Sequence, residues 1–370
     1  MTRKIGIMKY YFTSESVTSG HPDKICDLIA DSILDEAIRQ DKNSHMAVEA
    51  TIKDDFILIY GEANTKADID YASIAKGVLK EIGYLEDYEV LVKVNKQSSE
   101  IDQAVVAYKE LGAGDQGIMF GYACDETDDL MPLSIDLAHK LAKKLEEVRR
   151  ANPDKLKPDG TTQVTVEYID GEISRVDTIV VSSQHAKDLS QEALRRLIMN
   201  EVINPIVDAK YLDADTKYFI NPSGSFVVGG SFGDSGTTGR KIVVDTYGGH
   251  APIGGGCFSS KDPSKVDRSA AYYARYVCKN IVAAKLAKRC QIELSYAIGK
   301  PRPLSVNVNT FNTSKYSDEE LTAIINRNFD FSVRNIIDEL DLLRPIYKET
   351  TNYGHFGKEN LPWEQIITLK

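Results

Sequence analysis

Residues 224–268, GSFVVGGSFGDSGTTGRKIVVDTYGGHAPIGGGCFSSKDPSKVDR, organise this chain. Eleven of its 25 glycines lie between Gly224 and Gly256, too densely for a packed core and without the repeats of a linker. Glycine lets the backbone adopt positive φ and approach a ligand closely. The cations at the edges of this stretch are Arg240, Lys241, Lys261 and Lys265. Glycine-lined backbone beside cations indicates a polyphosphate site, and the carboxylates Asp234 and Asp267 indicate a divalent metal ion there.

Composition narrows the function classes. The 370 residues suffice for two to three domains, and 42% hydrophobic with 27% charged residues is ordinary for a globular protein. The excess of 55 acidic over 45 basic residues argues against a nucleic-acid binder. Apolar runs of about 18 residues and a secretory signal are both lacking, so we expect no membrane association. Five scattered cysteines without a CxxC pair favour a reduced, cytoplasmic setting and no zinc site.

The segment Ser19-Gly-His-Pro-Asp-Lys24 predicts a helix start. Pro22 suits the first helical position, which makes His21 the expected N-cap and places Asp23 in the first turn. The helix is predicted to reach about Gln40. Its apolar face consists of Ile25, Leu28, Ile29, Ile33 and Ala37.

Further elements follow a coarse repeat of helix, strand, strand and helix at 21–82, 133–202 and 262–329. The repeat predicts an α+β protein of three units, each a sheet with helices on one face. Asp170-Gly171 is the turn signal of a hairpin between strands 161–168 and 172–181. We also expect a strand at 242–246 and a long helix that Asp262-Pro263 caps and that ends near Arg289.

Residues 97–117 are polar and then glycine-rich, which predicts a mobile lid. Gly112–Gly117 matches GxGxxG, but a dinucleotide fingerprint needs a strand before it and a helix after it. Here the helical pattern comes first and the strand-like residues 118–124 follow, so we reject that interpretation.

Ordered blocks along nearly the whole chain resemble the methionine adenosyltransferase (S-adenosylmethionine synthetase) family. The blocks are FTSESVTSGHPDKICDLIADSILD, GAGDQGIMFGYACDET, TQVTVEY, TGRKIVVDTYGG, FSSKDPSKVDRSAAYYARYVCKNIVAA and PIYKETTNYGHFG. The resemblance implies transfer of the adenosyl group of ATP to the sulfur of L-methionine, then cleavage of triphosphate to phosphate and diphosphate. It implies two Mg²⁺ per site, a K⁺ and three similar α/β sandwich domains in pseudo-threefold arrangement. We place these domains at 1–105, 106–230 and 231–370, with boundaries that need not be continuous.

The resemblance also implies roles for individual residues. Catalysis is expected from His21, Arg240, Lys241, Lys261 and Lys265. ATP binding is expected from His21, Asp159, Ser225, Phe226, Asp234, Arg240, Lys241, Cys257 and Lys261. Methionine binding is expected from Glu62, Gln97, Asp115, Asp234 and Lys265. Asp23 and Asp267 are expected to hold Mg²⁺, and Glu49 to hold K⁺. The family implies a homodimer with shared active sites, paired into a homotetramer.

Each role has a simpler alternative. His21 can act only as a helix cap, and Asp23 can merely complement the helix dipole. The spacing of Lys261 and Lys265 also suits a solvated helix face, and Glu49 and Glu62 can face solvent.

Several positions depart from the family pattern. Thr161 stands where a lysine that touches the triphosphate is usual, and Ser225 where arginine is usual. Cys257 replaces a usual alanine, Ser260 a usual glycine and Thr237 a usual leucine. Loss of one charge-assisted contact commonly costs about 1.5–3 kcal/mol. A non-catalytic, nucleotide-binding regulatory paralogue is therefore the alternative function.

Overall fold

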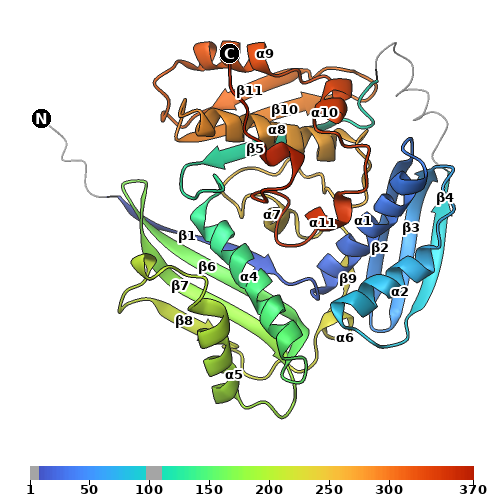
Figure 1. Ribbon diagram of the computed structural model, residues 1–370, viewed down its shortest axis with the longest axis vertical. Helices are drawn as coiled ribbons and strands as arrows, with labels where there is room; N and C mark the ends of the chain where they lie inside the picture. Colours follow the sequence, from blue (N-terminus) through green and yellow to red (C-terminus); the bar gives the residue numbers. More distant parts are fainter. Residues whose placement is uncertain (1–7, 97–110) are drawn as a thin grey trace, which may run out of the picture.

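The computed structural model describes residues 8–96 and 111–370. These residues form three β-sheets with helices packed on them (Figure 1), so the predicted α+β class is confirmed. The predictions for Gln97 and for most of the lid lie outside the described residues. Among the described helices, none is both long and apolar enough to cross a membrane.

One sheet has the strand order β1–β6–β7–β8. Its strands are β1 (Lys9–Val17), β6 (Leu156–Ile169), β7 (Glu172–His185) and β8 (Lys217–Ile220). The helix α4 (Leu133–Ala151) packs on β1 and β6, while α5 (Gln191–Ile198) leads into a π-helical turn. At the β6–β7 turn, Asp170 and Gly171 have φ of 52° and 87°, which confirms the predicted hairpin.

A second sheet has the order β4–β3–β2–β9. Its strands are β2 (His45–Lys53), β3 (Phe56–Asn64), β4 (Glu89–Asn95) and β9 (Gly236–Thr237). Alternate residues of β2 are buried because α1 (Pro22–Gln40) covers one face of the strand. The helix α2 (Tyr71–Ile82) packs against α1 and β4.

The third sheet has the order β11–β10–β5. Its strands are β5 (Gly117–Cys124), β10 (Arg289–Tyr296) and β11 (Ser305–Asn309). The helix α8 (Val266–Ala283) packs on β5 and β10, α9 (Asp318–Asn328) on β11, and α10 (Val333–Glu339) on α8. Short elements complete the chain: α6 (Gly230–Gly233), α7 (Ile242–Asp245), α11 (Tyr347–Thr350) and the 3₁₀ turns Ala209–Tyr211 and Pro362–Glu364.

Each sheet takes one strand from a distant part of the chain. The N-terminal β1 pairs with β6, β5 pairs with β10, and β9 pairs with β2. Figure 1 shows this exchange as strands whose colour differs from that of the rest of their sheet. The three sheets are therefore discontinuous in sequence, and the domain ranges 1–105, 106–230 and 231–370 stay a prediction.

The start of α1 agrees with the sequence analysis. Pro22 is the first helical residue, and the side chain of the N-cap His21 accepts a hydrogen bond from the backbone N–H of Asp23. The predicted apolar face is buried in a core shared by the second and third sheets, whereas α4 and the first sheet have a core of their own.

One predicted element was wrong, and the predicted bounds of another were wrong. Residues 242–245 form the short helix α7 instead of a strand, because their backbone bonds locally, with the N–H of Asp245 donating to the carbonyl of Lys241. Their β-branched side chains suggested a strand, but tertiary context overrides that preference. The helix α8 begins at Val266 with Lys265 as its N-cap and ends at Ala283, so Asp262 is not its cap.

Candidate active site

The first turn of α1 meets two cations from the glycine-rich stretch. Asp23 Oδ2 accepts a hydrogen bond from Lys241 Nζ at 2.7 Å, and Arg240 Nη1 lies 3.6 Å from Asp23 Oδ1. Asp23 Oδ1 also accepts from the backbone N–H of Thr237 at 3.0 Å. Together with His21, we call Asp23, Arg240 and Lys241 the α1 group. The fold thus joins residues that lie more than 200 positions apart in sequence.

The imidazole of His21 is a neutral hydrogen-bonding group in this setting. Its Nδ1 accepts from the N–H of Asp23 at 3.2 Å, which leaves the proton on Nε2. Burial, and then the charge of Lys241, lower the pKa of His21 to about 4. At neutral pH the ring therefore presents an N–H donor rather than a positive charge.

Residues from several elements hold the loop before His21. Tyr84 Oη donates to the carbonyl of Gly20 at 2.8 Å, and a Cβ at Gly20 would collide with the backbone of Pro158. The hydroxyl of Ser19 donates to Glu146 on α4, which also accepts from Tyr353 Oη at 2.6 Å. This packing fixes the loop directly before His21.

A second cluster of charges lies at the N-terminus of α8. Lys261 Nζ donates to Asp267 Oδ2 at 2.6 Å, and Lys265 Nζ donates to Asp262 Oδ1 at 2.6 Å. We call Lys261, Lys265 and Asp267 the α8 group. Asp262 also accepts from the N–H of Met46 on β2 at 2.8 Å, so it ties this group to the second sheet.

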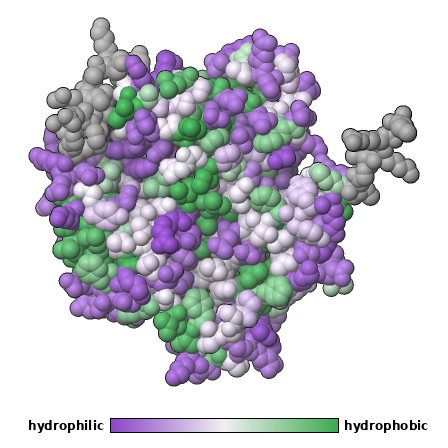
Figure 2. All heavy atoms as spheres, turned by 180° about the vertical axis from the view of Figure 1, so that it is seen from behind, coloured by the Kyte–Doolittle hydropathy of each residue, from purple (hydrophilic) through white to green (hydrophobic). Residues whose placement is uncertain are grey.

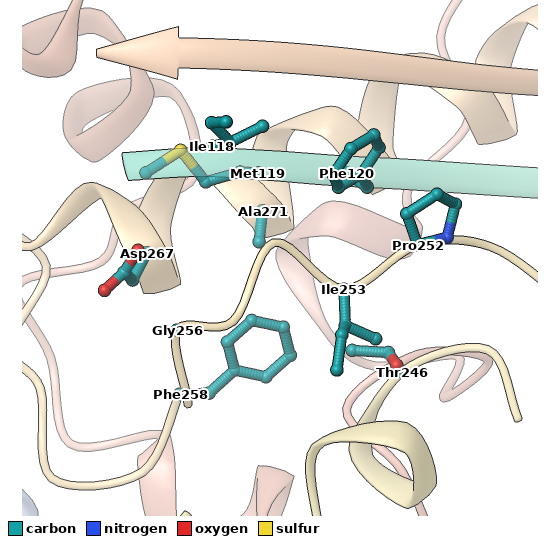
Figure 3. A pocket seen from close by; sticks show the side chains of 10 residues that line it. All are labelled: Ile118, Met119, Phe120, Thr246, Pro252, Ile253, Gly256, Phe258, Asp267 and Ala271. Carbon is teal, nitrogen blue, oxygen red and sulfur yellow. The ribbon is translucent and has the colours of Figure 1, made fainter. Parts of the chain in front are cut away.

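Asp267 borders a small, mostly apolar pocket between β5 and the loop 252–258 (Figure 3). A Cβ at Gly256 would lie only 2.3 Å from Asp267 Cγ, so glycine is needed there for the loop to approach the carboxylate. The other residues lining the pocket are Ile118, Met119, Phe120, Thr246, Pro252, Ile253, Phe258 and Ala271.

The strand β2 sets the separation of the two groups within one chain. Ala47 forms a bridge with Lys261, and Thr51 pairs with Thr237. Four strand residues span about 13 Å. The segments that carry Lys241 and Lys261 therefore meet β2 at different points along the same edge.

Of the residues expected to bind ATP, Asp159 lies close enough to Lys241, and Asp234 close enough to His21, for their charges to interact. Asp159 Oδ2 accepts from the N–H of Gly230 at 2.8 Å, and burial raises the pKa of Asp159 to about 6. Phe226 is half-buried and its N–H donates to His185 Nε2 at 3.1 Å, whereas Ser225 is exposed. Asp234 is exposed, and its charge acts on both Asp159 and His21.

The remaining predicted residues lie nearer the α8 group. Glu62 is exposed on β3 opposite Ala47, which in turn faces Lys261. Half-buried Asp115 follows Gly114, whose N–H donates to the carbonyl of Ser264.

The last two predicted residues, Glu49 and Cys257, lie between the α1 and α8 groups. Half-buried Glu49 accepts from Tyr60 Oη at 3.1 Å, and Cys257 packs against Gly239 beside Arg240.

Comparison with known proteins assigns the family. Models of the S-adenosylmethionine synthetase N-terminal, central and C-terminal domains match residues 9–105, 110–226 and 228–365. The chain belongs to the S-adenosylmethionine synthetase family. The S-adenosylmethionine synthase of Brachyspira hyodysenteriae is 52% identical over 97% of this chain and 96% of its own length. Those of Sorangium cellulosum and Staphylococcus epidermidis are 49% and 50% identical, over 96% and 97% of this chain and 88% and 96% of their own lengths.

The carboxylates of Asp23 and Asp267 are of the kind that could bind the metal ion expected of this family. Mg²⁺ prefers hard oxygen ligands and is commonly held by one or two carboxylates together with substrate phosphates and water. Asp23 and Asp267 each supply one carboxylate next to cations that attract phosphate. Among the described residues, no three His, Cys, Asp or Glu side chains form a site that could hold an ion without substrate. The donor set therefore fits a metal ion shared with the phosphates.

Sequence analysis gave no role to three further aspartates of α1. Asp27, Asp31 and Asp35 follow Asp23 at intervals of four residues, and all three are buried. The available signal was the spacing itself, because charged residues that recur every four positions on one helix share a face.

Proposed function

We propose that the chain is a transferase that joins the methionine sulfur to C5′ of ATP, releases triphosphate, and cleaves it to phosphate and diphosphate. The observation that carries this proposal is the pairing of Asp23 with Lys241 and of Asp267 with Lys261, at the N-termini of two helices. Helix N-termini and ammonium groups both attract phosphate oxygens. The 49–52% identity to S-adenosylmethionine synthases supports this function over a regulatory paralogue.

In the first step the sulfur lone pair forms the C–S bond while the bond between C5′ and the triphosphate oxygen breaks. The electron pair leaves on that oxygen, so catalysis requires positive charge and hydrogen-bond donors directed at it. Neutral His21 offers its Nε2–H, and Lys241 and Arg240 offer cationic donors from the same side. Sulfur is nucleophilic without a base, and the residues act by positioning.

The α8 group and the residues near it would bind methionine and part of the triphosphate. Lys261 neutralises phosphate charge, while Lys265, Glu62, Gln97, Asp115 and Asp234 orient methionine. Mg²⁺ held by Asp23 and Asp267 would neutralise the triphosphate, and Glu49 would hold K⁺. Phe226 and Asp159 would bind the adenosine beside the α1 group.

Two substitutions favour the regulatory alternative. Thr161 lies half-buried on β6, paired with Val17 of β1, and Ser225 is exposed near Phe226. Neither supplies the cation that is usual in the family. Lys155 and Lys157 are candidates to compensate, and Lys157 donates to the carbonyl of Pro153 at 3.0 Å.

Incubation with ATP, L-methionine, MgCl₂ and KCl tests the function, with S-adenosylmethionine and triphosphate followed separately. We expect S-adenosylmethionine to form together with phosphate and diphosphate. Product with accumulating triphosphate would assign the effect of Thr161 to the second step. Saturable ATP binding without product would support the regulatory paralogue instead.

We further infer a homodimer with shared active sites, paired into a homotetramer. The separation of the α1 and α8 groups along β2 suits a site completed by a second chain. Strand side chains not covered by helices include Tyr11, Leu91 and Ile118, about half exposed. The side opposite to that of Figure 1 shows hydrophobic side chains gathered near its middle (Figure 2), as a self-association surface would.

Mixing two inactive variants tests the shared site. Asp23→Asn and Asp267→Asn chains, co-expressed with different tags, should together regain about a quarter of wild-type activity, because half of the dimers are mixed and each has one intact site. Each variant alone supplies the control. Failure to regain activity in purified mixed dimers would show that Asp23 and Asp267 of the same chain serve one site.

A further inference from the structure

The helix α1 carries a row of four aspartates, Asp23, Asp27, Asp31 and Asp35, which we call the aspartate row. Residues four apart lie on one face of a helix, about 6 Å from each other along its axis. All four are buried, with 0–7% of each residue exposed. Buried carboxylates are rare unless hydrogen bonds or ion pairs compensate them. The partners of each aspartate therefore indicate why the row exists.

The first two aspartates hold the segment that carries Arg240 and Lys241. Asp23 Oδ1 accepts from the N–H of Thr237, and Asp27 Oδ1 accepts from the N–H of Gly239 at 2.8 Å. Two alternate backbone N–H groups are thus fixed to one helix, directly before the two cations. A loop rich in glycine would otherwise move freely at this point.

Lys24 fixes the far side of the same segment. Its Nζ lies 3.0 Å from Asp27 Oδ2 and 2.6 Å from Asp245 Oδ1 at the end of α7. All three side chains are buried. The segment with Arg240 and Lys241 is therefore held before the cations by Asp27 and after them by Lys24.

The third aspartate holds the segment that carries Lys261. Asp31 accepts from Ser259 Oγ at 2.8 Å and from the N–H of Ser260 at 3.2 Å. It also forms a two-pronged pair with Arg268, at 2.7 and 2.9 Å, and Arg268 Nη1 donates to the carbonyl of Lys261 at 3.2 Å. Asp31 thus contacts the two residues directly before Lys261, and it reaches the carbonyl of Lys261 through Arg268, the residue after Asp267.

Asp35 also accepts hydrogen bonds from backbone N–H groups, but these belong to a segment other than those of Lys241 and Lys261. It accepts from the N–H groups of Tyr347 and Lys348, each at 2.9 Å. That segment carries none of the cations of the α1 or α8 group. Asp35 therefore provides a control within the same row.

We propose that the aspartate row sets the relative position of the two cationic segments, with Asp27 and Asp31 as positioning residues. Asp27 acts through Gly239 on Arg240 and Lys241, and Asp31 acts through Ser260 and Arg268 on Lys261 and Asp267. The helix is a rigid spacer, so the two segments keep a fixed offset of about one helical turn between these anchors. The proposal rests on the proposed function, because both segments belong to the phosphate sites proposed there, the segment with Lys241 and the segment with Lys261 serving neighbouring sites of the dimer.

Double-mutant cycles test this assignment, since residues that act through one another give non-additive effects. We expect Asp27→Asn to lower kcat and to weaken Mg²⁺-tripolyphosphate binding, each about tenfold to a hundredfold, as small misplacements do. In a Lys241→Ala background, Asp27→Asn should change the Kd for Mg²⁺-tripolyphosphate, measured by calorimetry, less than about twofold. In a Lys261→Ala background, Asp27→Asn should keep its full effect on this Kd. Asp31→Asn should show the reverse pattern.

The control is Asp35→Asn, which should lower Tm as much as Asp27→Asn but leave kcat and Kd of the folded protein unchanged. Additive effects in all backgrounds would overturn the positioning proposal while leaving the proposed function intact. A wild-type chain that neither binds tripolyphosphate nor makes S-adenosylmethionine would overturn both.

Hydrogen exchange on the wild-type protein covers the case that a variant does not fold. The N–H groups of Gly239 and Ser260 should exchange slowly although both lie outside helices and strands. Exchange at both sites as fast as at exposed Gly255 would contradict the proposal.

Discussion

Replacing Asp23 with asparagine should lower kcat for S-adenosylmethionine formation about a thousandfold, and added MgCl₂ should not restore it. The amide has nearly the same shape but no charge. It leaves Lys241 and Arg240 without their common partner and removes one proposed Mg²⁺ ligand. Initial rates measured over a series of MgCl₂ concentrations provide the test.

Asp70 offers a matched control for this change. It is also an aspartate at the N-terminus of a helix, but its side chain accepts from the N–H and the hydroxyl of Ser73 instead of pairing with a cation. Asparagine caps helices about as well as aspartate, so Asp70→Asn should leave kcat unchanged. A kcat of Asp23→Asn within about tenfold of wild type would contradict the metal assignment and the role of the α1 group.

Replacing Lys265 with alanine should destabilise the protein by about 3–5 kcal/mol, because it leaves the buried carboxylate of Asp262 without its ionic partner. The two groups are 2.6 Å apart, and both side chains are less than a tenth exposed. Asp262 also anchors Met46 of β2, so the loss extends to the junction between β2 and α8. Chemical denaturation followed by circular dichroism measures the change.

Lys144 supplies the control for Lys265. It pairs with Glu147 on the exposed side of α4 at 3.3 Å, and exposed pairs contribute little. Lys144→Ala should alter stability by less than about 0.5 kcal/mol. If Lys265 also orients methionine, kcat or KM for methionine should change in the folded variant; a purely structural role predicts that both stay normal below the melting transition.

Local sequence signals predicted the features that depend on neighbours in the chain. Pro22 and His21 predicted the start of α1, and Asp170-Gly171 predicted the hairpin of the first sheet. Cations flanking a glycine-rich stretch predicted a polyphosphate site, and this stays a prediction; the structure shows that Arg240 and Lys241 lie beside Asp23. The helix start and the hairpin were confirmed because capping and turn chemistry act over a few residues.

Signals failed where distant partners decide the conformation. The run Ile-Val-Val-Asp at 242–245 has strand propensity, yet it forms α7, and its last residue pairs with Lys24 of α1. Asp262 is of a residue type common at helix N-caps, yet it accepts from the N–H of Met46, which lies 216 positions away in sequence. Partners so far away in sequence leave no periodic pattern near the residue.

The sequence by itself determined the α+β class, the family and the residues available for the proposed phosphate site. Only the tertiary structure decided that β1, β5 and β9 join sheets far from their neighbours in the chain, and that Asp27 and Asp31 bind the segments around Arg240 and Lys261. The physical reason is that a buried carboxylate is stabilised by whichever donors the fold brings to it. Its spacing along α1 can be seen in the sequence, but the identity of those donors cannot.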